Sequence, residues 1–202
     1  MNLNSIIIMI VAYFIGSIPT GFIFTSLIKG IDVREIGSGN VGATNAARAL
    51  GLKYGIIVAL LDVLKGVLAV SIVYIFIANP ATYLPFLAGF LAILGHDHSL
   101  FLKFSGGKGV ATTFGVILRL SPLIFMIIIV IWFLLSVLTR YVSVASLTAA
   151  LLMPLLAIFI FDNYISLLFY GLFGLLIIIK HHENIKRLRA GEENQLGSGS
   201  DQ

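Results

Sequence analysis

The sequence predicts an all-α integral membrane protein, built as a bundle of seven transmembrane helices of which one is short. Three observations support this fold class. The 202 residues are 59% hydrophobic and 11% charged, and the mean hydropathy is +1.06. The hydrophobic residues form runs of about 20, the length that crosses roughly 30 Å of hydrocarbon as a helix. Basic residues stand mainly at the ends of these runs.

Six helices correspond to long apolar runs. We expect them at Leu3–Ile28, Leu52–Ile77, Tyr83–Phe104, Leu123–Leu138, Val144–Ile160 and Tyr164–Ile179. The seventh lies between Gly109 and Leu120 and covers only roughly 18 Å at 1.5 Å per residue. It should begin below the membrane surface, where irregular backbone must be buried in protein or line a wet cavity.

The basic residues predict the orientation of the bundle, because cytoplasmic loops carry an excess of Lys and Arg. An outside N-terminus leaves Arg119 as the only basic residue outside, with Lys65 inside a span. The following then face the cytoplasm: Lys29, Arg34, Arg48, Lys53, Lys103, Lys108, Arg140, Lys180, Lys186, Arg187 and Arg189. We therefore expect the N-terminus outside and the C-terminus in the cytoplasm.

A single membrane domain is expected over residues 1–190. The polar residues 191–202 predict a disordered tail, in which 197–200 (Gly-Ser-Gly-Ser) has the composition of an artificial linker. The chain has no cysteine, which excludes disulfides, thiolate catalysis and thiolate metal sites. Its net charge of +4 is explained by topology, so nucleic acid is not an expected partner.

The first glycine-rich loop covers residues 37–45 and precedes a short expected helix. Asn40 or Thr44 should cap this helix, and Gly51 should end it. Asn45 and Arg48 are three residues apart and share a helix face. The residues that would surround a phosphate here are Ser38, Gly39, Asn40, Gly42, Asn45 and Arg48. The alternative is a solvated loop that uses glycine for its turns.

The second glycine-rich loop, Ser105–Gly109, opens the short helix. Amides such as that of Gly107, the helix dipole and Lys108 would all favour an anion. The loop is not a Walker A motif, because the first glycine, the preceding strand and the Lys-Ser/Thr pair are missing. The alternative is a basic turn at the membrane surface.

A third polar patch follows the last span. His181 and Asn184 share one helix face there, and Ser143 adds a hydroxyl on the same predicted side of the membrane. The patch lacks the spacing of a zinc-binding His-Glu-x-x-His motif. The alternative is an ordinary basic helix end.

Other ionisable residues carry weaker signals. Asp62 and Lys65 lie three apart inside a span, so they should pair and face the protein interior, with a structural role favoured. His96 and His98 flank Asp97, but no further ligand cluster accompanies them, so we expect no metal and no cofactor. The chain also lacks a His-x4-Asp pair and a Gly-x-Ser-x-Gly nucleophile elbow.

Three motifs occur in order along nearly the whole chain: residues 37–48, residues 106–112, and His181-x-x-Asn184-Ile185-x-Arg187-Leu188-x-x-Gly191-Glu192. Gly16-Ser17-Ile18-Pro19 and Gly95-His96 accompany them. With these motifs the chain closely resembles the bacterial membrane acyl-phosphate:glycerol-3-phosphate acyltransferases. One departure is that the family has an aromatic-proline pair where this chain has His98-Ser99.

The resemblance implies transfer of a fatty acyl group from acyl phosphate to the 1-hydroxyl of glycerol 3-phosphate, the first step of phospholipid synthesis. The products would be lysophosphatidate and inorganic phosphate. The site would lie on the cytoplasmic side of a bacterial inner membrane, with the lipid bilayer and the two substrates as partners and no obligatory protein partner. Acyl phosphate is already activated, so no covalent acyl-enzyme is expected, and catalysis would rest on orientation and charge stabilisation.

The resemblance also implies residue roles. The catalytic candidates are His181, Asn184, Ser38 and Lys108. Ser38, Arg48, Lys108, Ser143 and His181 would bind the two phosphates, assisted by the amides of Gly39, Gly42 and Gly107, with Asn40 beside them. Asn45 and Asn184 would position the glycerol or polarise the carbonyl. The base is either His181 or a substrate phosphate.

Two other functions fit a polar membrane protein. A transporter for a phosphorylated metabolite would also use helix N-termini at membrane depth. The sequence shows no inverted repeat, and its polar motifs gather on one face, which argues against that function. Three separate clusters of Gly, Asn, Lys and His also argue against a purely structural membrane subunit.

Overall fold

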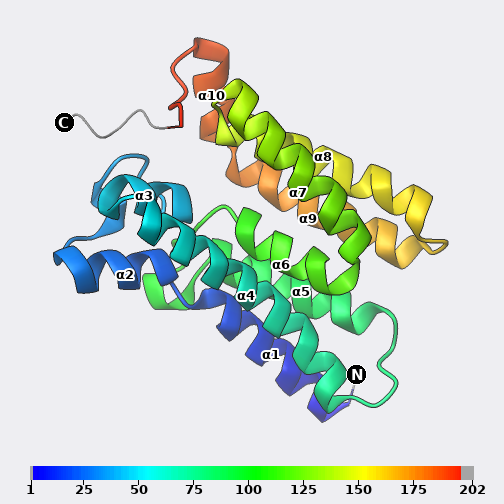
Figure 1. The fold of residues 1–202 in the computed structure, drawn as a ribbon. Helices are drawn as coiled ribbons and strands as arrows, with labels where there is room; N and C mark the ends of the chain where they lie inside the picture. The colour runs from blue at the N-terminus through cyan, green and yellow to red at the C-terminus, as the bar shows by residue number, and fades with distance from the viewer. Residues whose placement is uncertain (1, 197–202) are drawn as a thin grey trace.

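The computed structural model describes residues 2–196, and the regular elements in this range are helices (Figure 1). The α-helices are α1 (Leu3–Ser17), α2 (Thr20–Lys29), α3 (Ala43–Leu50), α4 (Leu52–Phe76), α5 (Tyr83–Asp97), α6 (Val110–Leu120), α7 (Pro122–Thr139), α8 (Val142–Ile160), α9 (Tyr164–Lys180) and α10 (His182–Ala190). Two short 3-10 helices, η1 (Val33–Glu35) and η2 (Leu100–Leu102), complete the order. The predicted all-α class is confirmed.

Within residues 2–196, four helical segments are long and apolar enough to cross a membrane. They are Leu3–Lys29, which combines α1 and α2, together with α4, α7 and α8. A fifth is obtained if α9 and α10, which meet at 56°, are taken as one bent span. The helices α5 and α6 are apolar but shorter. The number of seven spans and the orientation of the termini stay predictions.

The first expected span is not one continuous helix. It breaks at Ile18-Pro19, where α1 ends and α2 begins. Proline has no N–H to donate and disfavours helical backbone in the residue before it. At this break the Ile18 carbonyl accepts hydrogen bonds from the Thr20 amide at 3.0 Å and from Lys65 Nζ at 2.7 Å.

The expected span Tyr83–Phe104 was also too long, because α5 ends at Asp97. The chain then folds back, and the Gly107 amide donates to the His96 carbonyl at 2.9 Å. A Cβ atom on Gly106 would collide with the same carbonyl oxygen. The second glycine-rich loop is therefore packed directly against the end of α5.

The helices form two groups that meet along their length (Figure 1). One group contains α1, α4, α5 and α6, and the other contains α7, α8 and α9. Within the first group α4 and α6 are in close contact. Gly66 and Gly115 allow this contact, since a Cβ atom on either residue would collide with the backbone of the other helix. Small residues at a helix interface permit such contact in a membrane.

An aromatic cluster joins α5 of the first group to α9 of the second. The Phe86 and Phe169 rings stack with centroids 5.7 Å apart, and Tyr170 meets Phe86 edge-on at 6.1 Å. Tyr170 and Phe173 are fully buried. This contact packs α5 of the first group against α9 of the second. The cavity described below lies between the two groups, nearer one end of the molecule.

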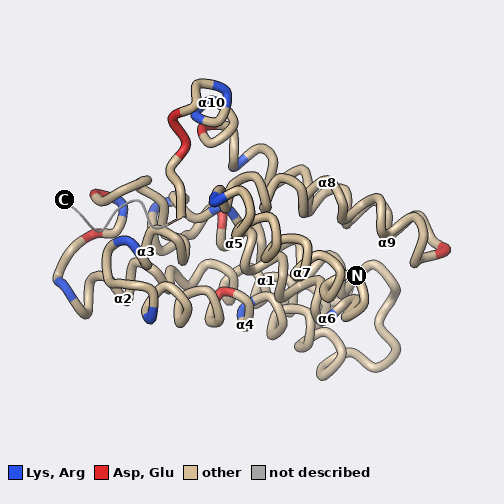
Figure 2. The backbone as a smooth tube through the Cα atoms, turned by 45° about the horizontal axis from the view of Figure 1, so that its top comes forward, with Lys and Arg blue, Asp and Glu red and all other residues tan. Residues whose placement is uncertain are grey.

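Charge is distributed unevenly along the bundle. The N-terminus and the end of the described chain lie at opposite ends of the molecule (Figure 1). Figure 2 shows that Lys and Arg gather mainly at the end formed by α2, α3 and α10. We call this the cationic end, and it carries the candidate site.

Candidate active site

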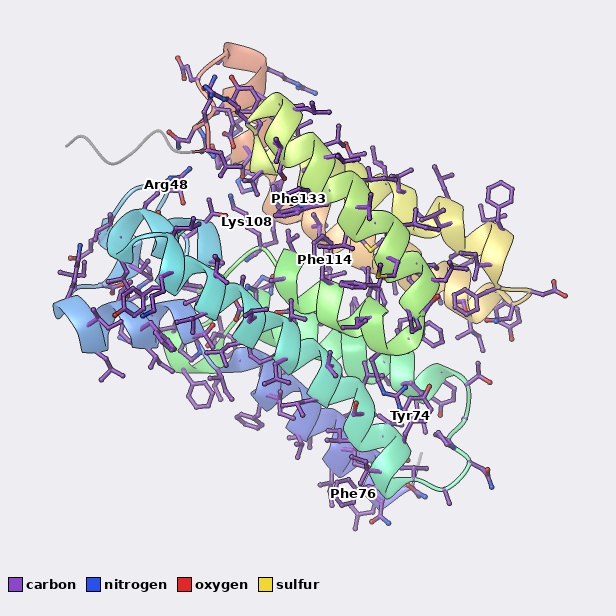
Figure 3. The ribbon with its side chains drawn as sticks, in the orientation of Figure 1. Arg48, Tyr74, Phe76, Lys108, Phe114 and Phe133 are labelled. Carbon is purple, nitrogen blue, oxygen red and sulfur yellow. The ribbon has the colours of Figure 1, made fainter. Side chains whose placement is uncertain are left out.

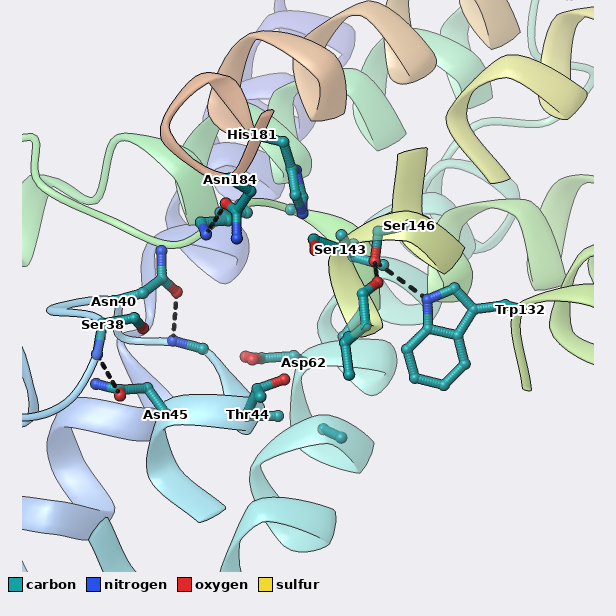
Figure 4. A pocket seen from close by; sticks show the side chains of 18 of the residues that line it. Ser38, Asn40, Thr44, Asn45, Asp62, Trp132, Ser143, Ser146, His181 and Asn184 are labelled. Atoms are coloured by element: carbon teal, nitrogen blue, oxygen red, sulfur yellow. Dashed lines mark hydrogen bonds between the residues drawn. The ribbon is translucent and has the colours of Figure 1, made fainter. Parts of the chain in front are cut away.

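A cavity of about 290 Å³ lies between the two helix groups at the cationic end (Figure 4). It brings together all three sequence motifs. The predicted site residues that line it are Ser38, Asn40, Gly42, Asn45, Arg48, Lys108, Ser143, His181 and Asn184. Gly39 and Gly107 are outside this lining. The cavity thus unites segments more than a hundred residues apart in the sequence.

The first loop leads into α3 differently from what the sequence predicted. Gly42, not Asn40 or Thr44, is the N-cap of α3. Asn40 instead accepts a hydrogen bond from the Gly42 amide at 2.8 Å, which shapes the turn before the helix. Gly51 ends α3 as predicted, with a φ of 92° that favours glycine. Arg48 lies in the last turn of α3 and lines the cavity.

Asn45 holds the loop in shape. Its Nδ2 donates to the carbonyls of Val33 and Ile36 at 2.8 and 2.9 Å, and its Oδ1 accepts from the Ser38 amide at 3.0 Å. The side chain is 1% exposed. These contacts occupy both Nδ2 hydrogens and one side of Oδ1, so Asn45 is placed to organise residues 33–38 around the cavity.

The glycine amides assigned to phosphate binding already donate elsewhere in this structure. The Gly39 amide donates to the Ile36 carbonyl at 3.0 Å, the Gly42 amide to Asn40 Oδ1, and the Gly107 amide to the His96 carbonyl. Side chains rather than these three amides therefore face the cavity with free hydrogen-bonding capacity.

Three cations and two carboxylates line the cavity, and one of the carboxylates, Asp62, is paired with Lys65. Arg48, Lys108 and Arg187 line it together with Glu193. Burial, reinforced by the charge of Arg187, lowers the pKa of Lys108 to about 8, and burial also lowers the pKa of Arg48. The net surplus of positive charge suits a phosphate dianion, whose binding would relieve the repulsion among these cations.

A hydrogen-bonded chain fixes the second and third motifs against each other. Lys108 Nζ donates to Asn184 Oδ1 at 2.5 Å, and Asn184 Nδ2 donates to Glu193 Oε1 at 2.6 Å. Arg187 Nε donates to the other Glu193 oxygen at 2.8 Å. Burial alone would raise the pKa of Glu193, but these donors lower it. Because Asn184 Nδ2 donates to Glu193, the Oδ1 atom of Asn184 is the one that faces Lys108.

Glu193 was missed by the sequence analysis, which assigned residues 191–202 to a polar tail and quoted Glu192 in the third motif. The described part of this tail, residues 191–196, runs back over the cavity. The Leu196 amide donates to the Arg140 carbonyl at 2.8 Å, and Asn194 and Leu196 line the cavity. The expected linker at 197–200 lies outside the described residues, and the division into a domain and a disordered tail stays a prediction.

His181 lies just past the end of α9 and is 4% exposed. Its Nδ1 is 2.8 Å from the Ile177 carbonyl oxygen. Because a carbonyl can only accept, Nδ1 must carry the proton, and in the neutral ring Nε2 is then the bare acceptor. Figure 4 shows the ring projecting toward the cavity. His181 is therefore oriented to accept a proton or a hydrogen bond there.

The other end of the cavity is apolar. Phe114 on α6 and Ile129 and Trp132 on α7 line it, and the Phe114 and Trp132 rings meet edge-on at 5.7 Å. Trp132 Nε1 donates to Ser146 Oγ at 3.1 Å, which satisfies the indole and leaves its ring as an apolar wall. Figure 3 places Arg48 and Lys108 toward the cationic end and Phe114 further along the bundle. The cavity thus joins a cationic head to an apolar continuation.

The His96-Asp97-His98 segment does not gather into a metal site. Among residues 2–196 no group of three or more His, Asp or Glu side chains could hold a metal ion. His96 instead lies beside Asp62 and Lys65, whose predicted pairing is confirmed at 2.6 Å.

Comparison with known proteins identifies the family. The family model described as glycerol-3-phosphate acyltransferase matches residues 6–191. The chain belongs to the glycerol-3-phosphate acyltransferase family. A family member from Chlorobaculum tepidum is 40% identical over 228 residues, covering 98% of each chain. Another, from Bacillus subtilis, is 43% identical over 182 residues, covering 90% of this chain and 92% of the relative.

Solved structures of the glycerol-3-phosphate acyltransferase family have the same fold. A crystal structure of PlsY (YgiH), described as an integral membrane glycerol 3-phosphate acyltransferase in its glycerol 3-phosphate form, matches with a TM-score of 0.89 and 40% identity over 96% of each chain. Its lysophosphatidic acid form matches with a TM-score of 0.86 and 39% identity. The fold is thus that of a multi-pass integral membrane protein.

Proposed function

We propose that this chain transfers a fatty acyl group from acyl phosphate to the 1-hydroxyl of glycerol 3-phosphate and releases lysophosphatidate and inorganic phosphate. One observation carries the proposal: a single cavity joins Arg48, Lys108 and Arg187 to the apolar surface of Phe114, Ile129 and Trp132. A substrate pair with two phosphates and one acyl chain needs both kinds of surface. The family membership supports acylation of glycerol 3-phosphate.

The reaction requires attack of the glycerol hydroxyl oxygen on the acyl carbonyl carbon. The new ester bond forms as the bond from that carbon to the phosphate oxygen breaks, and phosphate leaves with the bonding electrons. The hydroxyl proton goes to His181 Nε2 or to a substrate phosphate. Because acyl phosphate is a mixed anhydride, the protein needs no covalent intermediate and acts by orientation and charge stabilisation.

The site residues divide between binding and proton transfer. Arg48 and Lys108 bind phosphate, with the Ser38 and Ser143 hydroxyls as further donors, since all four line the cavity. Asn184, held by Glu193, orients Lys108 and the acceptor. His181 presents its bare Nε2.

The cationic end faces the cytoplasm of a bacterial inner membrane in this proposal, with the N-terminus outside. The concentration of Lys and Arg at that end supports the orientation (Figure 2). Glycerol 3-phosphate then enters from the cytoplasm, while the acyl chain lies along the apolar end of the cavity.

Purified protein in detergent, supplied with acyl phosphate and glycerol 3-phosphate, tests the proposal through release of phosphate and formation of lysophosphatidate. A parallel reaction contains acyl-CoA as the only donor. We expect turnover with acyl phosphate alone. Equal turnover with acyl-CoA would refute the donor assignment, and phosphate release without lysophosphatidate would refute the acyl transfer.

A further inference from the structure

A buried polar cluster lies beside the cationic end of the cavity, where α2, α4 and α5 meet. Its members are Thr20, Asp62, Lys65 and His96, each 8% exposed or less. The Asp62 carboxylate pairs with Lys65 Nζ at 2.6 Å and accepts from Thr20 Oγ1 at 2.5 Å. Asp62 and His96 also line the cavity that contains Lys108.

Stability alone is a poor explanation for this cluster. Asp62 and Lys65 lie in α4, a helix of 25 residues that is long and apolar enough to span the membrane. Taking two charges out of water is expensive, and well-packed apolar residues in place of a buried pair are often neutral or stabilising. Ionisable residues at membrane depth generally accompany function.

The cluster reaches the second glycine-rich loop through His96. The His96 Nδ1 atom is 3.8 Å from Asp62 Oδ1 and 3.5 Å from Lys65 Nζ. The opposite edge of the ring faces Gly107, where a Cβ atom would collide with His96 Nε2. The His96 carbonyl also accepts the Gly107 amide hydrogen bond. His96 is therefore wedged between the ion pair and the residue that precedes Lys108.

Lys65 ties the same cluster to the break between α1 and α2. Its Nζ donates to the Ile18 carbonyl at 2.7 Å while it pairs with Asp62. Thr20, at the start of α2, contacts Asp62 from the other side of the break. Contacts from Ile18 and Thr20 at the helix break and from His96 on α5 thus surround the ion pair, and the ion pair in turn limits where the His96 ring can lie.

We propose that Asp62, Lys65 and His96 are positioning residues that set the Gly107–Lys108 loop for a substrate phosphate, an inference that rests on the proposed function. They act on phosphate binding through the loop. The proton transfer and the charge stabilisation remain with the residues named above. Their removal should therefore weaken binding more than it slows the chemical step.

The test combines Asp62→Asn with Lys65→Met, which removes both charges and leaves neither one buried alone. Arg119→Met is the matched control, since Arg119 is a cation at the far end of α6 that donates to Ser71 Oγ at 3.2 Å. We expect the double variant to raise the KM for at least one phosphate-bearing substrate by ~10–100-fold, as for other residues that orient a binding group. The kcat should change much less, and the control should match the wild type.

His96→Leu alone keeps the ion pair and gives a second, independent variant. We expect the same rise in KM, and no further rise when it is combined with the double variant, because residues acting through one network are not additive. Unchanged KM values for both substrates in folded His96→Leu protein would overturn the proposal.

Binding without turnover separates this inference from the proposed function. Glycerol 3-phosphate should raise the thermal unfolding temperature of the wild type by mass action, and by less in His96→Leu. An equal rise in both proteins would overturn the positioning role. Acyl transfer by the wild type, measured separately, decides the proposed function.

Discussion

Replacing Lys108 by Met should separate stability from activity. Burial lowers the Lys108 pKa from 10.5 to about 8, so at about 1.4 kcal/mol per pKa unit the charged form of Lys108 costs the folded protein ~3 kcal/mol. The lost hydrogen bond to Asn184 offsets part of this, since bonds to charged groups contribute about 1.5–3 kcal/mol. Lys108→Met should therefore unfold at the same temperature as the wild type or at a higher one.

Activity should respond in the opposite direction. Lys108 Nζ lies in the cavity beside Arg48 and Arg187, where a phosphate would be its charged partner. Losing one member of a buried charged pair costs about 3–5 kcal/mol, which corresponds to a loss of kcat/KM of roughly 10²-fold to a few thousand-fold. Phosphate release with acyl phosphate and glycerol 3-phosphate measures this loss.

The pH dependence of stability gives an independent check on Lys108. Its folded pKa lies below its unfolded value, so the unfolded chain binds more protons between about pH 8 and 10.5, and wild-type stability gains a contribution as pH rises through this window. That contribution should be absent from Lys108→Met. Lys53→Ala, at an exposed position, serves as the control and should be almost neutral. Equal, mild losses of activity at both positions would refute the placement of a phosphate at Lys108.

Three further predictions test the site and the topology. Gly107→Ala should lower activity by at least ~10-fold, a loss of about 1.4 kcal/mol, because its Cβ would collide with His96 Nε2; wild-type turnover would show that the loop yields freely. Glu193→Gln should raise KM while the protein stays folded, because a neutral amide weakens the contact with Arg187; a KM equal to that of the wild type would contradict this. Asn40→Cys in this cysteine-free chain should resist membrane-impermeant thiol reagents in intact cells, and labelling from outside would reverse the proposed orientation.

Much of the fold follows from the sequence. The length of each apolar run, and the polar, glycine or proline residues that end it, can be read from the local sequence. A run of about 20 apolar residues is long enough to cross the hydrocarbon of a bilayer as a helix. The α4, α7, α8 and α9 helices therefore begin and end within two residues of their predicted bounds. The break at Ile18-Pro19 and the return of the chain at Gly106 were missed. Pro19 was visible in the sequence, but the hydrogen bond from Lys65 to the Ile18 carbonyl and the contact of Gly106 with the His96 carbonyl depend on tertiary packing.

The site divides in the same way. The sequence by itself determined which segments carry Gly, Asn, Lys and His, and the three motifs, taken in order, were enough to indicate the family. Only the tertiary structure decided what each side chain does. Asn45 hydrogen-bonds to its own loop, and Glu193, from the predicted tail, accepts a hydrogen bond from Asn184. Lys108 donates to Asn184, which lies 76 residues further along the sequence. The physical reason is that hydropathy acts along the chain, whereas a hydrogen bond needs a donor and an acceptor within about 3 Å of each other, and only packing brings such distant partners together.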